Sequence, residues 1–421
     1  MSQSVSFASY RAALSTPAAR LPVLAALLGR LPVAMVGLAL MLYVRQSTGS
    51  FASAGLVSAG ALTGAAIGSV LQGRLVDRFG PTRPLLTAAA LLTLFTTLGV
   101  TAVESGAPVW LLMTIALALG VSQPSVSSSS RSLWSRLLPP GPARQAAYSY
   151  EAISMEVFFI LGPAIAGLLM ALPWPGTGVV IGAGSMVIGA VGFALTPAVR
   201  AWRERTEPRA GQGLLAVLTP AMRTVALAAF GFGVTIGFVE IAVPAAATMA
   251  GYPSSVGGLL LSLWSVSSVV AGLLYGLRPV PRPMYLRLPV LLAAFSLLLL
   301  LLVWQTSLAG LAIALLVVGT LITPQATAHS IAVDEVAPAG SSTEAFGWVI
   351  TSVTLGLAAG QSVSGQLIEL SGPPLAFAAA TVAGLLIAGG VWLRRRTVRD
   401  ALPAVSPADC AVPAEVVATA R

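Results

Sequence analysis

Long apolar stretches recur along this chain, and they limit what it can fold into. A run of about 20 apolar residues is long enough to cross a hydrocarbon layer about 30 Å thick as an α-helix. Twelve such runs are separated by short polar breaks. They cover residues 21–44, 52–73, 84–103, 108–130, 146–171, 177–197, 221–248, 255–277, 284–304, 308–330, 344–368 and 374–393. We therefore expect twelve membrane-spanning helices.

The composition agrees with a membrane protein and excludes other classes. Hydrophobic residues make up 56% of the 421 residues and charged residues only 9%, whereas soluble domains carry about 25% charged residues. The apolar runs are continuous and rich in Leu, Ala and Gly, and they lack the alternating strands of a lipid-facing barrel. The predicted fold class is an all-α polytopic membrane protein.

The strongly basic balance is explained by membrane orientation. The net charge is +9 and every basic residue is an arginine. Alternate loops are rich in arginine, except the loop between the tenth and eleventh runs, whereas the loops between them offer only Arg45. Loop by loop, the arginines are at positions 11 and 20; 74, 78 and 83; 131, 136 and 144; 200, 203, 205, 209 and 223; 278, 282 and 287; and 394–396 and 399. By the positive-inside rule both termini are cytoplasmic, and the partner of this charge is anionic lipid rather than nucleic acid.

The chain is organised as two halves. The polar stretch 200–220 divides the runs six and six, so we expect bundles over 1–199 and 221–395, a cytoplasmic linker between them, and a disordered tail over 396–421. An offset of 203 residues aligns 54–73 with 257–276, and an offset of 198 lays 162–167 over 360–365. Two matches at nearly one offset predict a duplication, with substrate bound between the halves.

One loop carries a specific motif between the second and third runs. Gly73 is followed four and five residues on by Asp77 and Arg78, and then by Gly80 and Arg83. This pattern resembles the loop signature of the major facilitator superfamily. The resemblance implies that family's fold of two pseudo-symmetric six-helix bundles, transport by alternating access, and a cytoplasmic gate formed by these five residues.

The residue types of this motif suit a gate. Gly73 allows two helices to approach closely, and the Asp77 carboxylate is suited to face a helix N-terminus. Arg78 and Arg83 are suited to bridge to carboxylates or backbone carbonyls. The simpler alternative is an ordinary basic turn that serves topology alone.

A second motif lies in the fifth run. Gly162, Pro163 and Gly167 resemble a Gly-Pro signature of exporting members of the same superfamily, with Ala166 in place of an expected glycine. Pro163 removes a backbone donor and bends the helix, while its small neighbours allow close packing. The resemblance implies export, although glycine and proline are common in membrane helices in general. The arginine that the family links to proton coupling is missing from residues 116–130.

Ionisable residues inside the runs are site candidates because their insertion is costly. Arg30 and Glu156 lie nine and ten residues into the first and fifth runs, so we expect them to pair at one depth. Protonation of Glu156 would then release Arg30 and couple a proton to movement, and the alternative is a static ion pair. Glu151 is expected to reach Arg131 or Arg144 in a structural role.

Further polar residues are expected along the transport pathway. Glu240 stands alone in the outer half of the seventh run and is predicted to face the central cavity, to meet Arg45, or to lie at the interface. Gln123 and Gln325 belong to polar clusters at corresponding places in the fourth and tenth runs, and we expect both to line the pathway.

These observations together predict a secondary transporter. One histidine and one cysteine cannot form a metal site, and no nucleotide motif or other cofactor signature is present. We expect a monomer in the bacterial cytoplasmic membrane that exports a small organic substrate in exchange for protons. The alternatives are uptake or facilitated diffusion of a sugar-like nutrient, and a non-transporting receptor or enzyme on the same scaffold. No clustered catalytic residues favour the enzyme.

Overall fold

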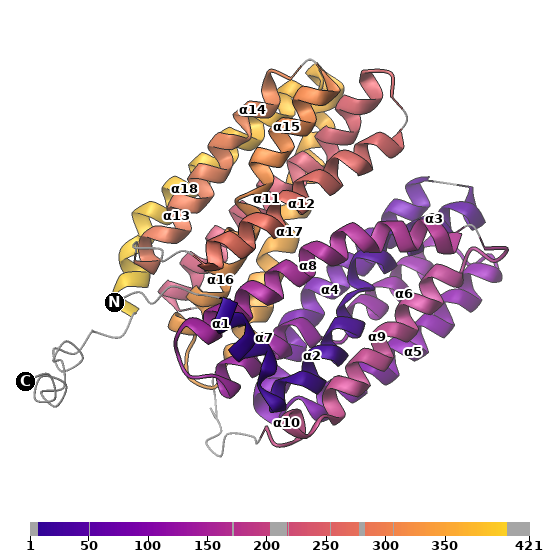
Figure 1. Cartoon of the computed structure of the whole chain (residues 1–421). Coiled ribbons are helices and arrows are strands. Elements are labelled where there is room, and N and C mark those ends of the chain that lie inside the picture. The colour runs from indigo at the N-terminus through magenta and orange to yellow at the C-terminus, as the bar shows by residue number, and fades with distance from the viewer. Residues whose placement is uncertain are drawn as a thin grey trace, which may run out of the picture.

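A computed structural model describes residues 7–49, 51–170, 172–202, 217, 219–252, 254–277, 283–305 and 307–401. The regular structure within these residues is helical. The helices form two elongated groups that lie beside one another, one from each half of the chain (Figure 1). We call them the N-half and the C-half.

The helices of the N-half are α1 (Phe7–Ser15), α2 (Pro17–Arg30), α3 (Val33–Thr48), α4 (Phe51–Phe79), α5 (Thr82–Glu104), α6 (Val109–Val121), α7 (Val126–Leu137), α8 (Pro142–Met170), α9 (Thr177–Leu195) and α10 (Pro197–Arg200). Those of the C-half are α11 (Pro220–Met249), α12 (Ser254–Leu277), α13 (Met284–Leu298), α14 (Leu300–Val303), α15 (Leu308–Gly319), α16 (Ile322–Val336), α17 (Ser342–Ser371) and α18 (Pro373–Ala401).

The twelve predicted spans correspond to these helices. Within the described residues, eleven continuous or kinked helices are long and apolar enough to cross a membrane. The twelfth is α8, which is equally long and contains Glu151 and Glu156. Some spans are broken in the middle, as α2 and α3 are at Pro32 and α6 and α7 are at Pro124. Proline causes such breaks because it lacks the N–H that an α-helix needs.

Corresponding glycines support the predicted duplication. Gly120 of α6 packs on the carbonyl of Ala61, and a Cβ atom on this glycine would collide with it. Gly319 of α15 packs in the same way on the carbonyl of Trp264. Ala61 and Trp264 are 203 residues apart, which is the offset that aligns the two halves in sequence. The same close helix contact is therefore built twice, as expected for small residues between membrane helices.

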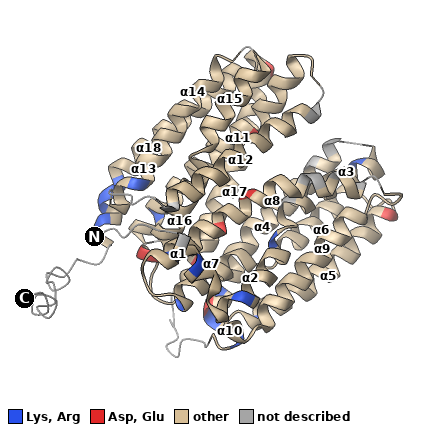
Figure 2. Cartoon of the chain, in the orientation of Figure 1, with Lys and Arg blue, Asp and Glu red and all other residues tan. Residues whose placement is uncertain are grey.

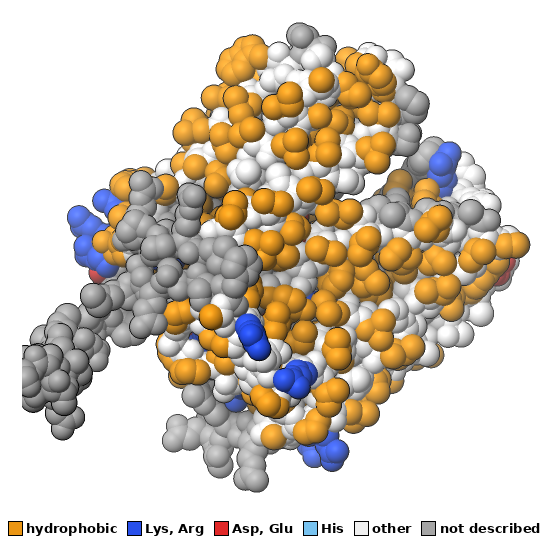
Figure 3. Space-filling model, viewed as in Figure 1, with side chains coloured by type: hydrophobic (Ala, Val, Ile, Leu, Met, Phe, Trp, Pro, Cys, Tyr) orange, Lys and Arg blue, Asp and Glu red, His pale blue; other side chains and the backbone are white. Residues whose placement is uncertain are grey.

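The apolar core that the two halves share lies toward one end of the molecule. A single cluster of buried apolar residues contains both halves, and it includes Tyr148 of α8 and Phe346 of α17, whose rings lie 6.2 Å apart. The other clusters belong to one half each. We call the end with α1, α10 and the last turn of α18 the closed end, and the other end the open end, where Figure 3 shows a notch between the halves. Charged side chains are concentrated at the closed end (Figure 2).

Several predicted boundaries are corrected by the structure. The fourth span continues to Leu137, so Arg131 lies inside a helix and not in a loop as expected. The tenth span continues to Val336, and α18 ends at Ala401 rather than before the predicted tail at 396. The proposed division of the chain into 1–199 and 221–395 stays a prediction, and most of the linker lies outside the described residues.

The orientation in the membrane can be tested with the only cysteine of the sequence, Cys410. Because α18 ends at the closed end, we expect Cys410 to be cytoplasmic and to react with a membrane-impermeant maleimide only after cells are permeabilised. As the control, Cys410→Ser combined with Ser105→Cys places a thiol in an exposed turn at the open end, and this variant should react in intact cells. The reverse pattern would contradict the predicted orientation.

Candidate functional site

Asp77, at the end of α4, makes a polar contact between the halves. Its carboxylate accepts hydrogen bonds from the backbone N–H groups of Thr343, at 3.2 Å, and Glu344, at 2.8 Å. These groups belong to the first turn of α17, where N–H groups lack partners within the helix. The prediction that Asp77 faces a helix N-terminus is confirmed, and the helix belongs to the other half.

Close packing of α4 and α17 surrounds this contact. A Cβ atom on Gly73 would lie 2.7 Å from the carbonyl oxygen of Thr343, and one on Gly347 would lie 2.5 Å from that of Ser69. The space left by both glycines allows Thr351 to donate a hydrogen bond to the carbonyl of Ala66 at 2.7 Å. Larger residues at either glycine would separate the halves at the closed end.

The other motif residues are placed differently. Gly80 turns the chain with a φ of +74°, which a residue with a side chain rarely adopts. Arg78 and Arg83 are both exposed, and the guanidinium of Arg78 lies 5.0 Å from the ring centre of Phe79. Arg136 of α7 is instead the arginine whose charge acts on Asp77. A role of Arg78 and Arg83 in the gate stays a prediction.

A second polar contact closes the same end. Arg144 of α8 forms an ion pair with Asp334 of α16 at 2.9 Å. The same guanidinium donates a hydrogen bond at 3.0 Å to the backbone carbonyl of Ser135. Arg144 therefore binds the C-half and α7. It does not pair with Glu151, which was one of the two predicted alternatives.

The predicted pair of Arg30 and Glu156 is wrong. Arg30 is 1% exposed, and it forms its ion pair with Glu151 of α8. Glu151 and Glu156 are five residues apart, so they point about 140° away from each other around the helix. Counting residues along helices gives the depth of a side chain but not its direction, and only Glu151 faces α2.

Glu151 is the centre of a buried network. Its carboxylate accepts hydrogen bonds from the Ser130 hydroxyl at 2.8 Å and from the Trp134 indole N–H at 2.9 Å, in addition to the Arg30 contact. Arg131 lies close enough for its charge to interact with both Glu151 and Arg30. Arg131 is one of the two partners expected for Glu151, and it lies near this carboxylate. Its place inside α7 differs from the expected loop, because an arginine after an apolar run is typical of a cytoplasmic loop.

Glu156 faces the other half of the molecule. It lies beside Ser265 of α12 and within electrostatic range of Glu240 of α11. Glu240 accepts a hydrogen bond from the Gln361 amide at 2.8 Å. Two carboxyl groups, one from each half, thus lie near one another on the open-end side of the Arg30 network.

The predicted polar clusters lie at helix breaks. Gln123 stands in the break between α6 and α7, and the Gln72 amide of α4 holds this break by donating to the carbonyls of Val121, at 2.7 Å, and Gln123, at 2.9 Å. Gln325 of α16 is fully buried, with its amide nitrogen 3.5 Å from the Nε2 of His329. Whether either glutamine contacts substrate stays a prediction.

The Gly-Pro motif of the fifth span lies within α8, which continues as a helix through Gly162, Pro163 and Gly167 to Met170. The corresponding glycine of the C-half, Gly360, packs against the carbonyl of Val234 with no room for a side chain. The role of this motif in export stays a prediction.

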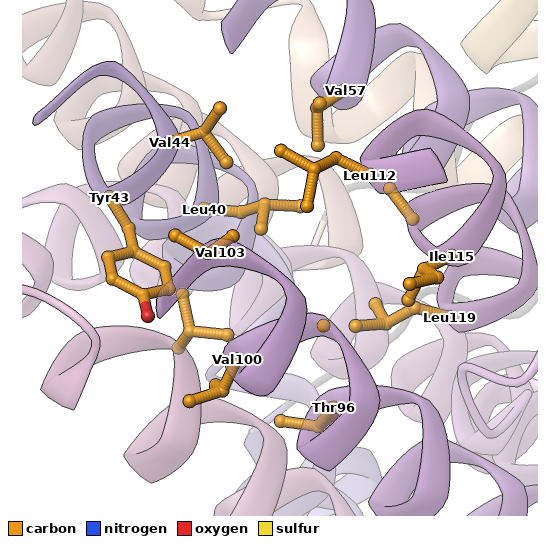
Figure 4. Close-up of a pocket in the computed structure, with 13 residues that line it drawn as sticks. Leu40, Tyr43, Val44, Val57, Thr96, Val100, Val103, Leu112, Ile115 and Leu119 are labelled. Atoms are coloured by element: carbon orange, nitrogen blue, oxygen red, sulfur yellow. The ribbon is translucent and has the colours of Figure 1, made fainter. Parts of the chain in front are cut away.

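One pocket lies inside the N-half rather than between the halves (Figure 4). Its lining is apolar apart from Tyr43 and Thr96. Such a lining offers few groups to orient a polar substrate. We therefore place the candidate functional site at the interface of the two halves.

Comparison with known proteins identifies the family. The family model of the Major Facilitator Superfamily matches residues 23–360. The chain belongs to the major facilitator superfamily. The Asp77 loop, recognised above from five residues, thus lies in a chain that matches the family over most of its length.

Individual relatives of this superfamily agree. The chain is 28% identical over 282 residues, covering 64% of this chain and 68% of the relative, to y4rN of Sinorhizobium fredii, described as an uncharacterized MFS-type transporter. Its fold matches the human organic anion transporter MFSD10, with a TM-score of 0.67 and 18% identity over 91% of this chain and 99% of that one. It also matches the proton:xylose symporter XylE, with a TM-score of 0.64 and 17% identity over 92% and 96%. Both structures support the superfamily fold.

The Asp77 contact predicts a shift in conformation when its charge is removed. Asp77→Asn loses the charge that favours the α17 N-terminus, so we expect the closed end to open and the open end to close in a larger share of molecules, by roughly tenfold or about 1.4 kcal/mol. Spin labels at Ser105→Cys and Ala250→Cys, in a Cys410→Ser background, should report shorter distances across the open end. Asp400→Asn, an exposed neutralisation at the same end, should leave the distances unchanged.

The Glu151 network predicts an order of stability among single neutralisations. Glu151→Gln leaves two arginines without a counter-charge, and breaking a buried pair in this way costs about 3–5 kcal/mol. Arg131→Gln leaves the pair of Arg30 and Glu151 intact and should cost least. Thermal unfolding of the purified variants, with the monomer yield from size-exclusion chromatography, measures this order. A Glu151→Gln protein as stable as Arg131→Gln would contradict it.

Proposed function

We propose that this chain is a secondary active transporter that exports a small organic molecule in exchange for protons by alternating access. The observation that carries the proposal is that Glu156 of one half and Glu240 of the other lie within electrostatic range of one another. Superfamily membership supports transport across a membrane. The direction, the coupling ion and the substrate are the proposed parts.

The contacts between the halves support alternating access. The halves meet at the closed end through Asp77, Arg144 and the apolar cluster. The two polar contacts consist of a few hydrogen bonds and one ion pair, which can break and re-form. Opening this end while the other closes would expose the interface alternately to the two sides of the membrane. In this proposal both termini and the closed end are cytoplasmic.

The two carboxyl groups support coupling to protons. Glu156 and Glu240 lie within membrane-spanning helices, where a lone charge is costly and protonation relieves the cost. Glu240 accepts a hydrogen bond from the uncharged Gln361, and Glu156 lies beside the uncharged Ser265. Protons entering from the open end would reach this pair before the Arg30 network.

Export is supported by the Gly-Pro pattern at Gly162 and Pro163, which resembles that of exporting members of the superfamily. Uptake or facilitated diffusion of a sugar-like nutrient is the alternative within transport. A receptor or enzyme is the alternative outside it, and the described residues contain no group of three or more metal-binding side chains that would favour the enzyme. We propose a monomer in the bacterial cytoplasmic membrane.

Everted vesicles test this proposal directly. The interior is acidified by respiration, and an acridine dye reports proton release when ethidium, norfloxacin, chloramphenicol or benzoate is added. We expect at least one probe to release protons with the wild type. Glu156→Gln should abolish proton release but keep the exchange of labelled for unlabelled probe, because it mimics the protonated state. The control is Glu369→Gln, an exposed carboxyl of α17, which should behave as wild type.

Three outcomes would count against the proposal. If none of the probes causes proton release, antiport loses its support. Concentration of a probe by right-side-out vesicles and not by everted ones makes the chain an importer. Full proton release by both Glu156→Gln and Glu240→Gln places the coupling group elsewhere.

A further inference from the structure

The network around Glu151 contains more positive charge than negative. Arg30 and Arg131 are both within range of Glu151 and of each other. Glu151 is fully buried and Arg30 is 1% exposed, while Arg131 is half-buried. One carboxylate therefore faces two guanidinium groups at the interface of the halves. A surplus charge inside a membrane protein is costly, and such a charge marks a functional site.

Other charged groups nearby do not balance this surplus. Among the described residues, Asp334 is held by Arg144, and Glu335 is exposed and lies near Arg287. Glu156 lies one and a half turns further along α8, beside Ser265 of α12. His329 of α16, which also faces Arg131, adds no negative charge. The second arginine thus has no carboxylate of its own in the part of the chain that the structure describes.

Hydrogen-bond donors of both arginines are also left over. The Nε and Nη2 atoms of Arg30 and the Nε atom of Arg131 are buried, and no described residue accepts a hydrogen bond from them. The hydroxyls of Ser128 and Ser129 on α7 and of Thr327 on α16 are also buried without a hydrogen-bond partner among the described residues. Leaving such donors unsatisfied is costly, and more so where the group is charged.

We propose that Arg30 and Arg131 form a binding site for the anionic group of the transported molecule, and that the group is a carboxylate. The unsatisfied guanidinium N–H groups match its two oxygens, because arginine and carboxylate pair through parallel hydrogen bonds. The neighbouring hydroxyls supply further donors. This inference rests on the proposed transport function and specifies its substrate class as small organic anions.

The position of the site couples it to the state of the gate. Arg30 and Arg131 lie on α2 and α7, and the contacts of α7 and α8 with the C-half cover them at the closed end. Separation of the halves there would expose the two arginines to the side that carries the closed end. On return to the conformation described here, Glu151 holds Arg30 and competes with the anion for it. The competition favours release toward the open end, which agrees with export.

Ligand-dependent unfolding of the purified full-length protein tests the inference without any transport assay. The probes are benzoate, benzamide and benzylammonium at equal ionic strength, which share a ring and differ in charge. We expect only benzoate to raise the unfolding temperature. Arg131→Gln should weaken benzoate binding about tenfold or more. Arg131→Lys should keep the preference for benzoate over benzamide. Arg20→Gln, an exposed position on the same helix as Arg30, should bind as wild type.

The outcomes separate this inference from the proposed function. Equal stabilisation by benzoate and benzamide, or undiminished benzoate binding by Arg131→Gln, overturns the anion site even where vesicles exchange protons for a probe. Selective benzoate binding that depends on Arg131 supports the site even where no probe releases protons, and then antiport alone fails. Where Arg131→Gln does not fold, Arg131→Lys decides: loss of selectivity for benzoate in a folded Arg131→Lys protein overturns the site.

Discussion

The buried carboxylate of Glu151 is the interaction on which the inner part of this transporter depends. A charge within a membrane protein must find partners inside the protein, because lipid offers none. Glu151 satisfies this condition for Arg30 and Arg131, and with Ser130 and Trp134 it ties α2, α7 and α8 together. These helices form the face of the N-half on which substrate access is proposed. The same carboxylate therefore stabilises the bundle and sets the charge of the candidate site.

Close contact between helices makes the interface of the halves sensitive to small changes. Gly73 and Gly347 let α4 and α17 approach until the backbone of one touches that of the other. Only at this separation does the Asp77 carboxylate reach the N–H groups of Thr343 and Glu344. Steric fit and electrostatics are thus linked, since a slight separation of the helices removes the hydrogen bonds together with the packing. A contact of this kind is either made or broken, which suits a gate.

Sequence reasoning recovered the features that repeat along the chain and missed those that depend on direction. Apolar length located the twelve spans because membrane thickness fixes that length. The spacing of Gly73, Asp77 and Gly80 indicated a helix N-terminus as the partner of Asp77, although the sequence gives no means of telling that α17 supplies it. Arg131 was assigned to a loop because a charged residue normally marks the end of a span. Here the nearby carboxylate of Glu151 stabilises the charge of Arg131 within a helix. The wrong partner was predicted for Arg30 because a residue count gives the depth of a side chain but not its direction around the helix.

The two groups of ionisable residues are staggered along the axis of the molecule, and this arrangement bears on how exchange is enforced. Glu156 and Glu240 lie nearer the open end, whereas Arg30, Arg131 and Glu151 lie nearer the closed end. A cavity that opens at one end at a time would present mainly the carboxyl pair to one side and mainly the arginines to the other. Protons and an organic anion would then be loaded from opposite sides of the membrane. Such loading agrees with the proposed exchange of an organic anion for protons.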